Sequence, residues 1–107
     1  MVKAKNDLYR HGKYWPIYLD IATYAENGSL AIQMLTDDNG FMEPWSMLTV
    51  NLSVTLPEGY AYVDTNNNGD EILDWIIENE LGELTGELGY SGFCIYPLVK
   101  FNLENPQ

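Results

Sequence analysis

The stretch DEILDWIIENEL, residues 70–81, decides the fold class, because it is the one segment of the chain with a clear helical pattern. Its apolar residues recur at three- and four-residue spacing and give a helix one broad apolar face; they are Ile72, Leu73, Trp75, Ile76, Ile77 and Leu81. Asn68 or Asp70 is suited to cap the N-terminus, and Gly82 is suited to follow the C-terminus. The sequence therefore predicts one amphipathic helix from about Asp70 to Leu81.

The segments on either side of this helix alternate apolar and polar residues, as β-strands do. The predicted strands are 15–24, 30–36, 45–56 and 60–63 before the helix and 93–101 after it. Glu26–Ser29 and Asp37–Gly40 have the Asn and Gly residues of tight turns, and Gly82–Gly92 is expected to be a flexible glycine-rich loop. This β-β-β-β-α-β order predicts an α+β fold: an antiparallel sheet of about five strands with the amphipathic helix packed on one face.

The length of 107 residues fits one domain. We expect residues 1–13 to form a basic N-terminal tail, charged by Lys3, Lys5, Arg10 and Lys13, and residues 14–107 to form the single α+β domain. The sequence has no secretory signal and no apolar run of about 20 residues. Its one cysteine, Cys94, fits a reducing compartment. These features indicate a cytoplasmic protein that does not enter a membrane.

The charge of the chain is strongly one-sided. The net charge is −11, and beyond Lys13 there are fifteen acidic side chains against a single basic one, Lys100. Direct binding to nucleic acid or to an anionic membrane depends on Lys and Arg and is therefore not expected. We expect a basic partner protein instead. The alternative is that the carboxylates form a solvated face that keeps a small protein soluble.

The helix carries part of this negative charge on its polar side. Glu71, Asp74 and Glu78 fall at i, i+3 and i+7, on one stripe opposite the apolar face. The helix has no Lys or Arg to form stabilising pairs with them, so helix stability does not explain the stripe. The predicted partner-binding residues are the stripe and the carboxylates that extend it: Asp70, Glu71, Asp74, Glu78, Glu80, Glu83 and Glu87.

Three tyrosines are candidates for a second interface. Tyr14, Tyr18 and Tyr24 fall on one face of the first predicted strand, opposite its aliphatic residues. If the helix covers only the aliphatic face, these rings lie on the open face of the sheet, and Tyr is enriched in interface hot spots. The alternative is that they pack under the N-terminal segment or against a second subunit.

The sequence does not predict a metal site or a catalytic site. Asp64–Gly69 matches the first half of a calcium-binding loop, but position 12 is Trp75, which has no ligating oxygen. An Asn-rich turn from strand to helix explains this segment better. Cys94 and His11 match no nucleophile–base motif, and no motif fixes a pair of carboxylates. We therefore expect a binding protein with no metal, no cofactor and no enzymatic activity.

Several segments together resemble a known protein family. They are Tyr24–Ile32, Leu48–Leu52, Val63–Asn67 and Ser91–Leu98. These segments resemble a family of small bacterial proteins of unknown function, carried mainly on phages and integrative conjugative elements, over most of the chain from about Lys13 onward. The resemblance implies a mobile element inside a bacterial host. Small acidic proteins from that setting include inhibitors of host defence, anti-CRISPR proteins among them.

The charge and the resemblance together lead to one functional hypothesis. We expect a mobile-element protein that inhibits a host defence nuclease, specifically an anti-CRISPR protein. Its acidic surface would imitate nucleic acid and block guide or target binding in the positively charged channel of the effector. Two alternatives stay open. One is a protein that sequesters a small signalling nucleotide, with the tyrosines stacking on the base, and the other is a non-inhibitory adaptor of the mobile element.

Overall fold

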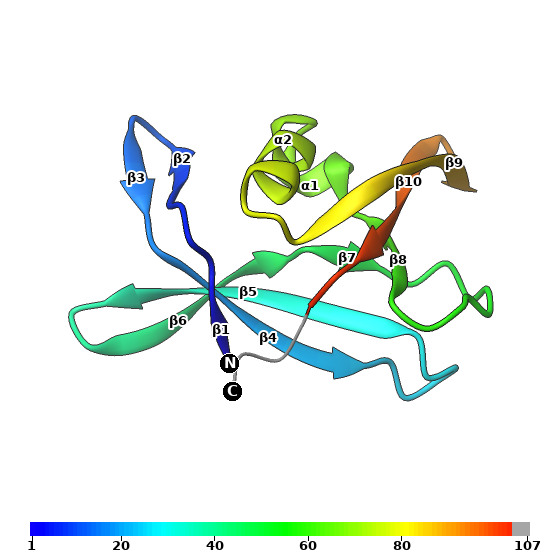
Figure 1. Cartoon of the computed structure of the whole chain (residues 1–107), viewed down its shortest axis with the longest axis horizontal. Helices are drawn as coiled ribbons and strands as arrows, with labels where there is room; N and C mark the ends of the chain where they lie inside the picture. The colour runs from blue at the N-terminus through cyan, green and yellow to red at the C-terminus, as the bar shows by residue number, and fades with distance from the viewer. Residues whose placement is uncertain (104–107) are drawn as a thin grey trace.

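The computed structural model describes residues 1–103 and contains two four-stranded antiparallel sheets, a separate two-stranded hairpin and two short helices (Figure 1). The elements are β1 (Val2–Lys3), β2 (Leu8–Arg10), β3 (Lys13–Trp15), β4 (Ile17–Thr23), β5 (Leu30–Asp38), β6 (Phe41–Met47), β7 (Thr49–Val50), β8 (Tyr60–Val63), α1 (Thr65–Asn68), α2 (Glu71–Glu78), β9 (Gly82–Ser91) and β10 (Cys94–Phe101). The α+β class is confirmed. The expectation of one sheet of about five strands is wrong, because the strands divide among three sheets.

The first sheet has the order β1-β4-β5-β6. Both predicted tight turns are confirmed: one joins β4 to β5, and the other joins β5 to β6. In the second turn Asn39 and Gly40 both adopt positive φ, at 54° and 89°, which Asn and Gly tolerate better than other residues. The Asp37 carboxylate accepts a 2.8 Å hydrogen bond from the Gly40 N–H and fixes the turn further.

The second sheet has the order β7-β8-β10-β9 and begins where the chain leaves the first sheet at Leu48. The Leu48 N–H donates to the Ile32 carbonyl in the first sheet, and the Leu48 carbonyl accepts from Asp64, just after β8. The predicted strand 45–56 is therefore wrong in extent. It is split into the end of β6 and the short β7, and residues 51–59 form no strand.

The glycine-rich segment after the helix is a strand, not the expected loop. It forms β9, which pairs with β10 in a long hairpin. Two of its glycines lie where a side chain would collide with a neighbour: a Cβ on Gly82 would lie 2.8 Å from the Lys100 carbonyl oxygen, and one on Gly89 would lie 2.5 Å from the Tyr62 ring. These glycines therefore permit close packing rather than chain flexibility.

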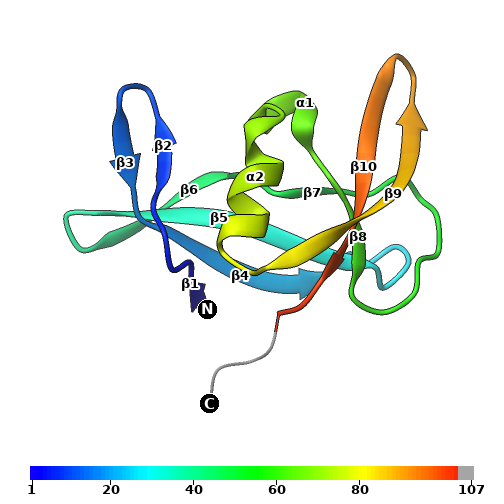
Figure 2. The same ribbon diagram turned by 45° about the horizontal axis from the view of Figure 1, so that its top comes forward.

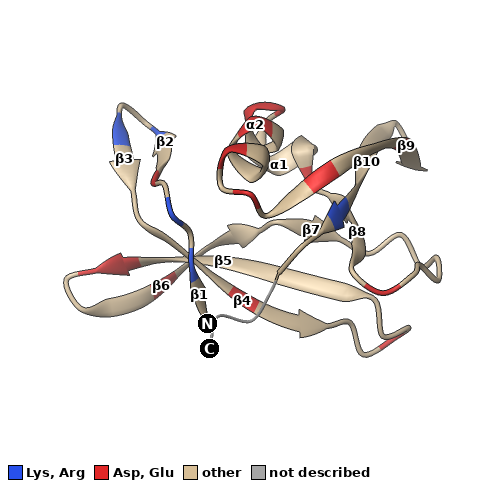
Figure 3. Ribbon diagram, in the orientation of Figure 1, with Lys and Arg blue, Asp and Glu red and all other residues tan. Residues whose placement is uncertain are grey.

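The N-terminal segment is part of the fold, so the expectation of a basic tail over residues 1–13 is wrong. β1 pairs with β4, and β2 pairs with β3 in a hairpin that rises beside α2 (Figure 2). Ala4 and Leu8 are 4% and 3% exposed and belong to the hydrophobic core. Arg10 and Lys13 consequently lie on the β2–β3 hairpin, which stands beside the acidic helix, whereas Lys3 lies on β1 in the first sheet (Figure 3).

The predicted helix is present but shorter than expected. Asp70 is the N-cap residue of α2, although its side chain makes no capping hydrogen bond. Asn68, the other predicted cap, does not cap α2, because its side-chain amide donates to the Met47 and Asp64 carbonyls. The helix ends at Glu78 because Glu80 turns to φ 56°, with its N–H bonded to the Ile77 carbonyl and the Leu81 N–H bonded to the Ile76 carbonyl. This is a Schellman ending with Glu80, not the predicted Gly82, in the left-handed position.

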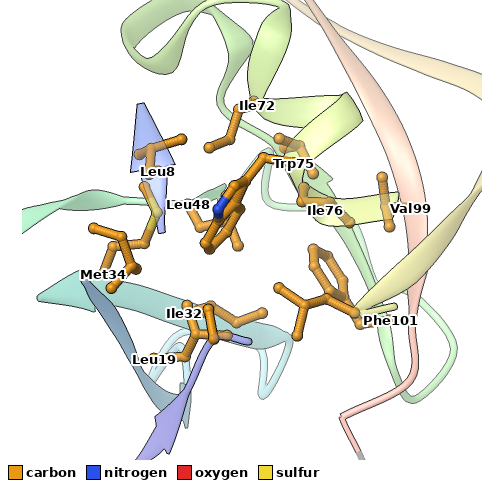
Figure 4. Close-up of a cluster of buried hydrophobic side chains, with 14 of the residues drawn as sticks. Leu8, Leu19, Ile32, Met34, Leu48, Ile72, Trp75, Ile76, Val99 and Phe101 are labelled. Carbon is orange, nitrogen blue, oxygen red and sulfur yellow. The ribbon is translucent and has the colours of Figure 1, made fainter. Parts of the chain in front are cut away.

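The core lies between α2 and the inner faces of the two sheets (Figure 4). Ile72, Trp75 and Ile76 are the buried residues of α2, at the spacing expected for one face of a helix. They meet Leu19, Ile32 and Met34 of the first sheet and Val99 and Phe101 of the second. Ile77 was placed on the same apolar face by the sequence but is 46% exposed. Within residues 1–103, no helix is both long enough and apolar enough to cross a membrane.

Candidate functional site

A groove runs between α2 and the β2–β3 hairpin and has a volume of about 530 Å³. Its walls come from segments more than 50 residues apart in the chain. One wall is Asn6, Asp7, Leu8, Tyr9, Arg10 and Tyr14, and the other is Glu71, Asp74, Trp75 and Glu78. The views in Figures 1 and 2 both show the hairpin standing beside the helix. The groove therefore exists only because the N-terminal segment folds against α2.

Hydrogen bonds from α2 hold the hairpin wall in place. The Trp75 indole N–H donates to the Asn6 carbonyl at 3.1 Å, and the Asn79 side-chain oxygen accepts from the Asn6 N–H at 2.7 Å. At the other end of the helical segment, the Arg10 guanidinium donates to the Asn68 carbonyl. Asn79 is a polar residue near the end of the predicted helix, which is the one sequence signal for this attachment. The structure buries it, so its amide needs hydrogen-bond partners.

The helix wall of the groove carries the stripe predicted from the sequence. Glu71, Asp74 and Glu78 are exposed, and Asp7 on the facing segment adds a fourth carboxylate. Arg10 is the only basic side chain that lines the groove, and its guanidinium donates to the backbone carbonyls of Tyr9 and Asn68. Among residues 1–103 the one ion pair is Lys5–Glu80, so these four carboxylates have no ionic partner in the described structure.

The other four predicted carboxylates lie outside this groove. Glu80 pairs with Lys5 at 2.9 Å, and the hydrogen bond and positive charge of Lys5 lower the pKa of the Glu80 carboxyl. Both side chains are largely exposed, so solvent weakens the pair. Asp70 precedes α2, and Glu83 and Glu87 lie on β9. The structure thus brings together three of the seven predicted residues and adds Asp7, which sequence reasoning had placed in a tail.

The three predicted tyrosines do not form one surface. Tyr14 lies on β3 and lines the groove, where its ring meets that of Tyr9 edge-on at 5.0 Å. Tyr18 lies on β4, paired with Leu35, on the face of the first sheet opposite the buried Ile17 and Leu19. Tyr24 follows the end of β4, and its hydroxyl forms a hydrogen bond with that of buried Thr49. The expectation of a shared tyrosine face is therefore wrong: Tyr14 belongs to the β2–β3 hairpin, Tyr18 belongs to the first sheet, and Tyr24 lies beyond the end of β4.

The segment that partly matches a calcium-binding loop is a capped helical turn. The Asp64 carboxylate accepts from the backbone N–H of Asn67 at 3.1 Å and from its side-chain amide at 2.8 Å. Its oxygens therefore satisfy the start of α1. The strand-to-helix interpretation is confirmed. The described residues contain no group of three or more His, Cys, Asp and Glu side chains placed to hold a metal ion.

The groove has the chemistry to receive cationic groups. Carboxylates accept charge-assisted hydrogen bonds from Lys and Arg, and the faces of Tyr9 and Tyr14 can attract the same cations. A nucleophile–base pair is not assembled in the groove: Cys94 lies on β10, and His11 lies at the turn of the β2–β3 hairpin. The site is therefore described by its charge and shape rather than by reactive groups.

Comparison with known proteins places the chain in a family without assigning it an activity. No curated protein and no solved structure was found to match it. One family model, described as "Domain of unknown function (DUF4313)", matches residues 18–107. The matched region includes α2 and both large sheets apart from β1, and the hairpin wall of the groove precedes it. Since the match covers most of its length, the chain belongs to the DUF4313 family.

Proposed function

We propose that this protein acts by binding a cationic partner protein in the groove between α2 and the β2–β3 hairpin. One observation carries the proposal: the carboxylates of Asp7, Glu71, Asp74 and Glu78 line a single groove with no ionic partner among residues 1–103. Like charges that share a surface repel one another, and a basic partner relieves that repulsion. The proposal assigns the protein a role in binding, without catalysis, metal or cofactor.

The two sides of the groove would contribute differently to such a complex. The acidic side would select a basic partner and increase its association rate, because complementary charge steers the encounter of two proteins. The aromatic side offers Tyr9 and Tyr14, which are 55% and 67% exposed. A cation over a tyrosine ring gains about 0.5–2 kcal/mol, depending on how well it is shielded from water. Lys or Arg side chains that protrude from the partner would interact with both the carboxylates and the tyrosine rings.

We propose a nuclease of bacterial host defence as the partner, with a CRISPR effector as the most specific candidate. This part of the proposal rests on the resemblance to proteins of phages and conjugative elements, and it places the protein in the cytoplasm. Such effectors hold their guide heteroduplex in a positively charged channel. A protein that occupies the channel with its carboxylates would block guide or target nucleic acid.

An inhibition assay tests this function. Purified CRISPR effectors are given guide and target, and cleavage is followed with increasing amounts of the protein. We expect at least one effector class to be inhibited by the wild-type protein, with inhibition lost in the triple variant Glu71→Lys, Asp74→Lys and Glu78→Lys. The matched control reverses three exposed carboxylates elsewhere, Asp20, Glu43 and Glu58, which changes the net charge equally. If this control loses inhibition to the same extent, the effect depends on net charge and not on the groove.

A further inference from the structure

The β9–β10 hairpin presents a second, chemically different surface. In the described part of the chain, β9 pairs with β10 alone, so its other side is a free edge of the second sheet. Figure 2 shows this hairpin extending on the far side of α2 from the β2–β3 hairpin. A long edge strand offers unpaired N–H and C=O groups to another chain, and native proteins usually protect such edges.

The outer half of the hairpin also exposes apolar side chains on one face. Ile95 is paired with Tyr90, and Pro97 is paired with Leu88, so these four side chains share a face. Along β10, alternation places Val99 and Phe101 on that face too, where they are buried against the core. Beyond the core the face is uncovered: Leu88 is 50%, Tyr90 66% and Ile95 51% exposed. The face that packs on the core thus continues into solvent as an apolar surface.

Carboxylates alternate with the apolar residues along β9. Glu83 is paired with Lys100 and therefore lies on the face opposite Leu84, which is paired with Val99. Glu87 directly precedes Leu88 and has no paired residue on β10, because it ends the irregular segment of β9. The register shifts between the Leu84–Val99 pair and the Leu88–Pro97 pair, and Gly86, which lies between them on β9, has a φ of 87°. The edge thus presents carboxylates on one face and leucines on the other, in two short stretches separated by a bulge.

We propose that the edge of β9 receives an extended strand of a partner protein in which basic and apolar residues alternate. Main-chain hydrogen bonds would extend the sheet by one strand. The apolar side chains of the partner would cover Leu84, Leu88 and Tyr90, and its Lys or Arg side chains would lie near Glu83 and Glu87. Charge complementarity selects this occupant, because each face of the edge specifies the side chains that can lie beside it.

A second copy of this chain is a poorer occupant of the same edge. Each copy has a net charge of −11, and pairing two β9 strands would bring Glu83 and Glu87 of both copies to one edge. The bulge at Gly86 also interrupts the regular ladder that a long self-paired strand would need. A basic strand of a different protein meets neither obstacle if it pairs with one of the two stretches.

This surface is separate from the acidic groove, and the inference does not depend on the function proposed for that groove. The test uses the intact protein and a synthetic probe, the peptide acetyl-Lys-Val-Lys-Val-Lys-Val-Lys-amide. Two control peptides are compared with it: one has the same residues arranged in blocks, and the other carries N-methyl groups at alternate positions. Affinity is measured by isothermal titration calorimetry. Circular dichroism checks that each protein variant is folded.

We expect the alternating peptide to bind at least about tenfold more tightly than either control peptide, a ratio equivalent to about 1.4 kcal/mol. The double variant Leu88→Ser and Tyr90→Ser should weaken binding about tenfold. The matched variant Phe41→Ser and Met42→Ser, which removes exposed apolar residues from the β5–β6 hairpin, should not. Glu83→Gln with Glu87→Gln should weaken binding and reduce its salt dependence, whereas reversal of Glu71, Asp74 and Glu78 should leave the preference for the alternating peptide intact.

Three results would overturn the inference. Equal binding of all three peptides would show only non-specific attraction to an acidic protein. Unchanged affinity in the Leu88 and Tyr90 variant would place the peptide elsewhere. Light scattering that shows a dimer of the free protein, dissociated by the same variant, would identify a second copy as the occupant. None of these outcomes bears on the groove, so the two proposals fail independently.

Discussion

The side-chain oxygen of Asn79 accepts a 2.7 Å hydrogen bond from the backbone N–H of Asn6, 73 residues earlier in the chain. The Asn79 amide nitrogen also donates to the Trp75 carbonyl at 2.8 Å, and the Trp75 indole donates to the Asn6 carbonyl. The N–H and the carbonyl of Asn6 are thus held by Asn79, the C-cap residue of α2, and by Trp75 of α2. Because this attachment positions the hairpin wall, it is the structural basis of the groove.

Substitution of Asn79 tests the attachment. Asn79→Ala leaves the Asn6 N–H without its partner at a position where Asn79 itself is 3% exposed. We expect the free energy of unfolding, measured with urea, to fall by about 1–3 kcal/mol. Asn66→Ala, an exposed position in α1, serves as the control and should change stability by less than about 0.5 kcal/mol. Equal stability of the two variants would contradict the role given to Asn79.

The N-terminal segment provides a second prediction, because truncating a side chain reduces the stability of the protein if the segment is packed but not if it is a tail. Leu8 is 3% exposed and lies in the core, so Leu8→Ala should reduce the free energy of unfolding by about 2–4 kcal/mol. Leu84→Ala removes the same atoms from a side chain that is 48% exposed and should cost much less. A Leu8→Ala variant with wild-type stability would show that residues 1–13 are a tail after all.

These two predictions show where sequence reasoning failed. The helix was found because Ile72, Trp75 and Ile76 repeat at helical spacing, and the tight turns were found because Asn and Gly allow positive φ. The N-terminal strands were missed because β1 and β2 have only two and three residues, too few to show alternation. They form because β1 pairs with β4, and because the β2–β3 hairpin is held against α2 by contacts between segments far apart in the chain, and a local pattern does not contain that information.

The candidate site was predictable only in part for the same reason. Helical spacing alone places Glu71, Asp74 and Glu78 on one stripe. Their grouping with Asp7, Tyr9 and Tyr14 depends on how the chain returns to α2, and pairing between distant segments decides that. The glycines of residues 82–92 predict a loop because glycine breaks strand patterns, whereas in β9 the close neighbours of Gly82 and Gly89 leave no room for a side chain.

The end of α2 gives a third prediction. Glu80 has a φ of 56°, a conformation that costs a residue with a Cβ about 1–2 kcal/mol relative to glycine. Both Glu80→Gly and Glu80→Ala remove the ion pair with Lys5. The difference between their free energies of unfolding therefore reports the cost of the backbone conformation at position 80. We expect the glycine variant to be more stable than the alanine variant by about 1 kcal/mol in thermal or urea unfolding. If the alanine variant is as stable or more so, the left-handed ending is incorrect.

The Lys5–Glu80 pair gives a pH prediction. Lys5 lowers the pKa of Glu80 from its ordinary value of 4.5, so the pair stabilises the folded state above that pH. Its contribution is lost as the pH falls below 4.5 and through the folded-state pKa. Lys5→Met should therefore be slightly less stable than Lys3→Met at neutral pH, and the difference should vanish in acid. Lys3→Met changes the net charge equally, and among residues 1–103 Lys3 has no carboxylate partner. A difference that persists or grows at low pH would exclude this pair as its source.

The most direct test of the central claim is the salt dependence of binding to an inhibited CRISPR effector, measured by calorimetry or fluorescence anisotropy. The protein with neutral substitutions Glu71→Gln, Asp74→Asn and Glu78→Gln is compared with a control carrying Asp20→Asn, Glu43→Gln and Glu58→Gln. We predict that the wild type and the control bind with affinities that fall steeply and equally with salt, because exposed charges are screened over about 10 Å at 0.1 M. The groove variant should bind more weakly and with a shallower salt slope. Equal affinity and slope in the two variants would contradict the assignment of the acidic groove as the binding site.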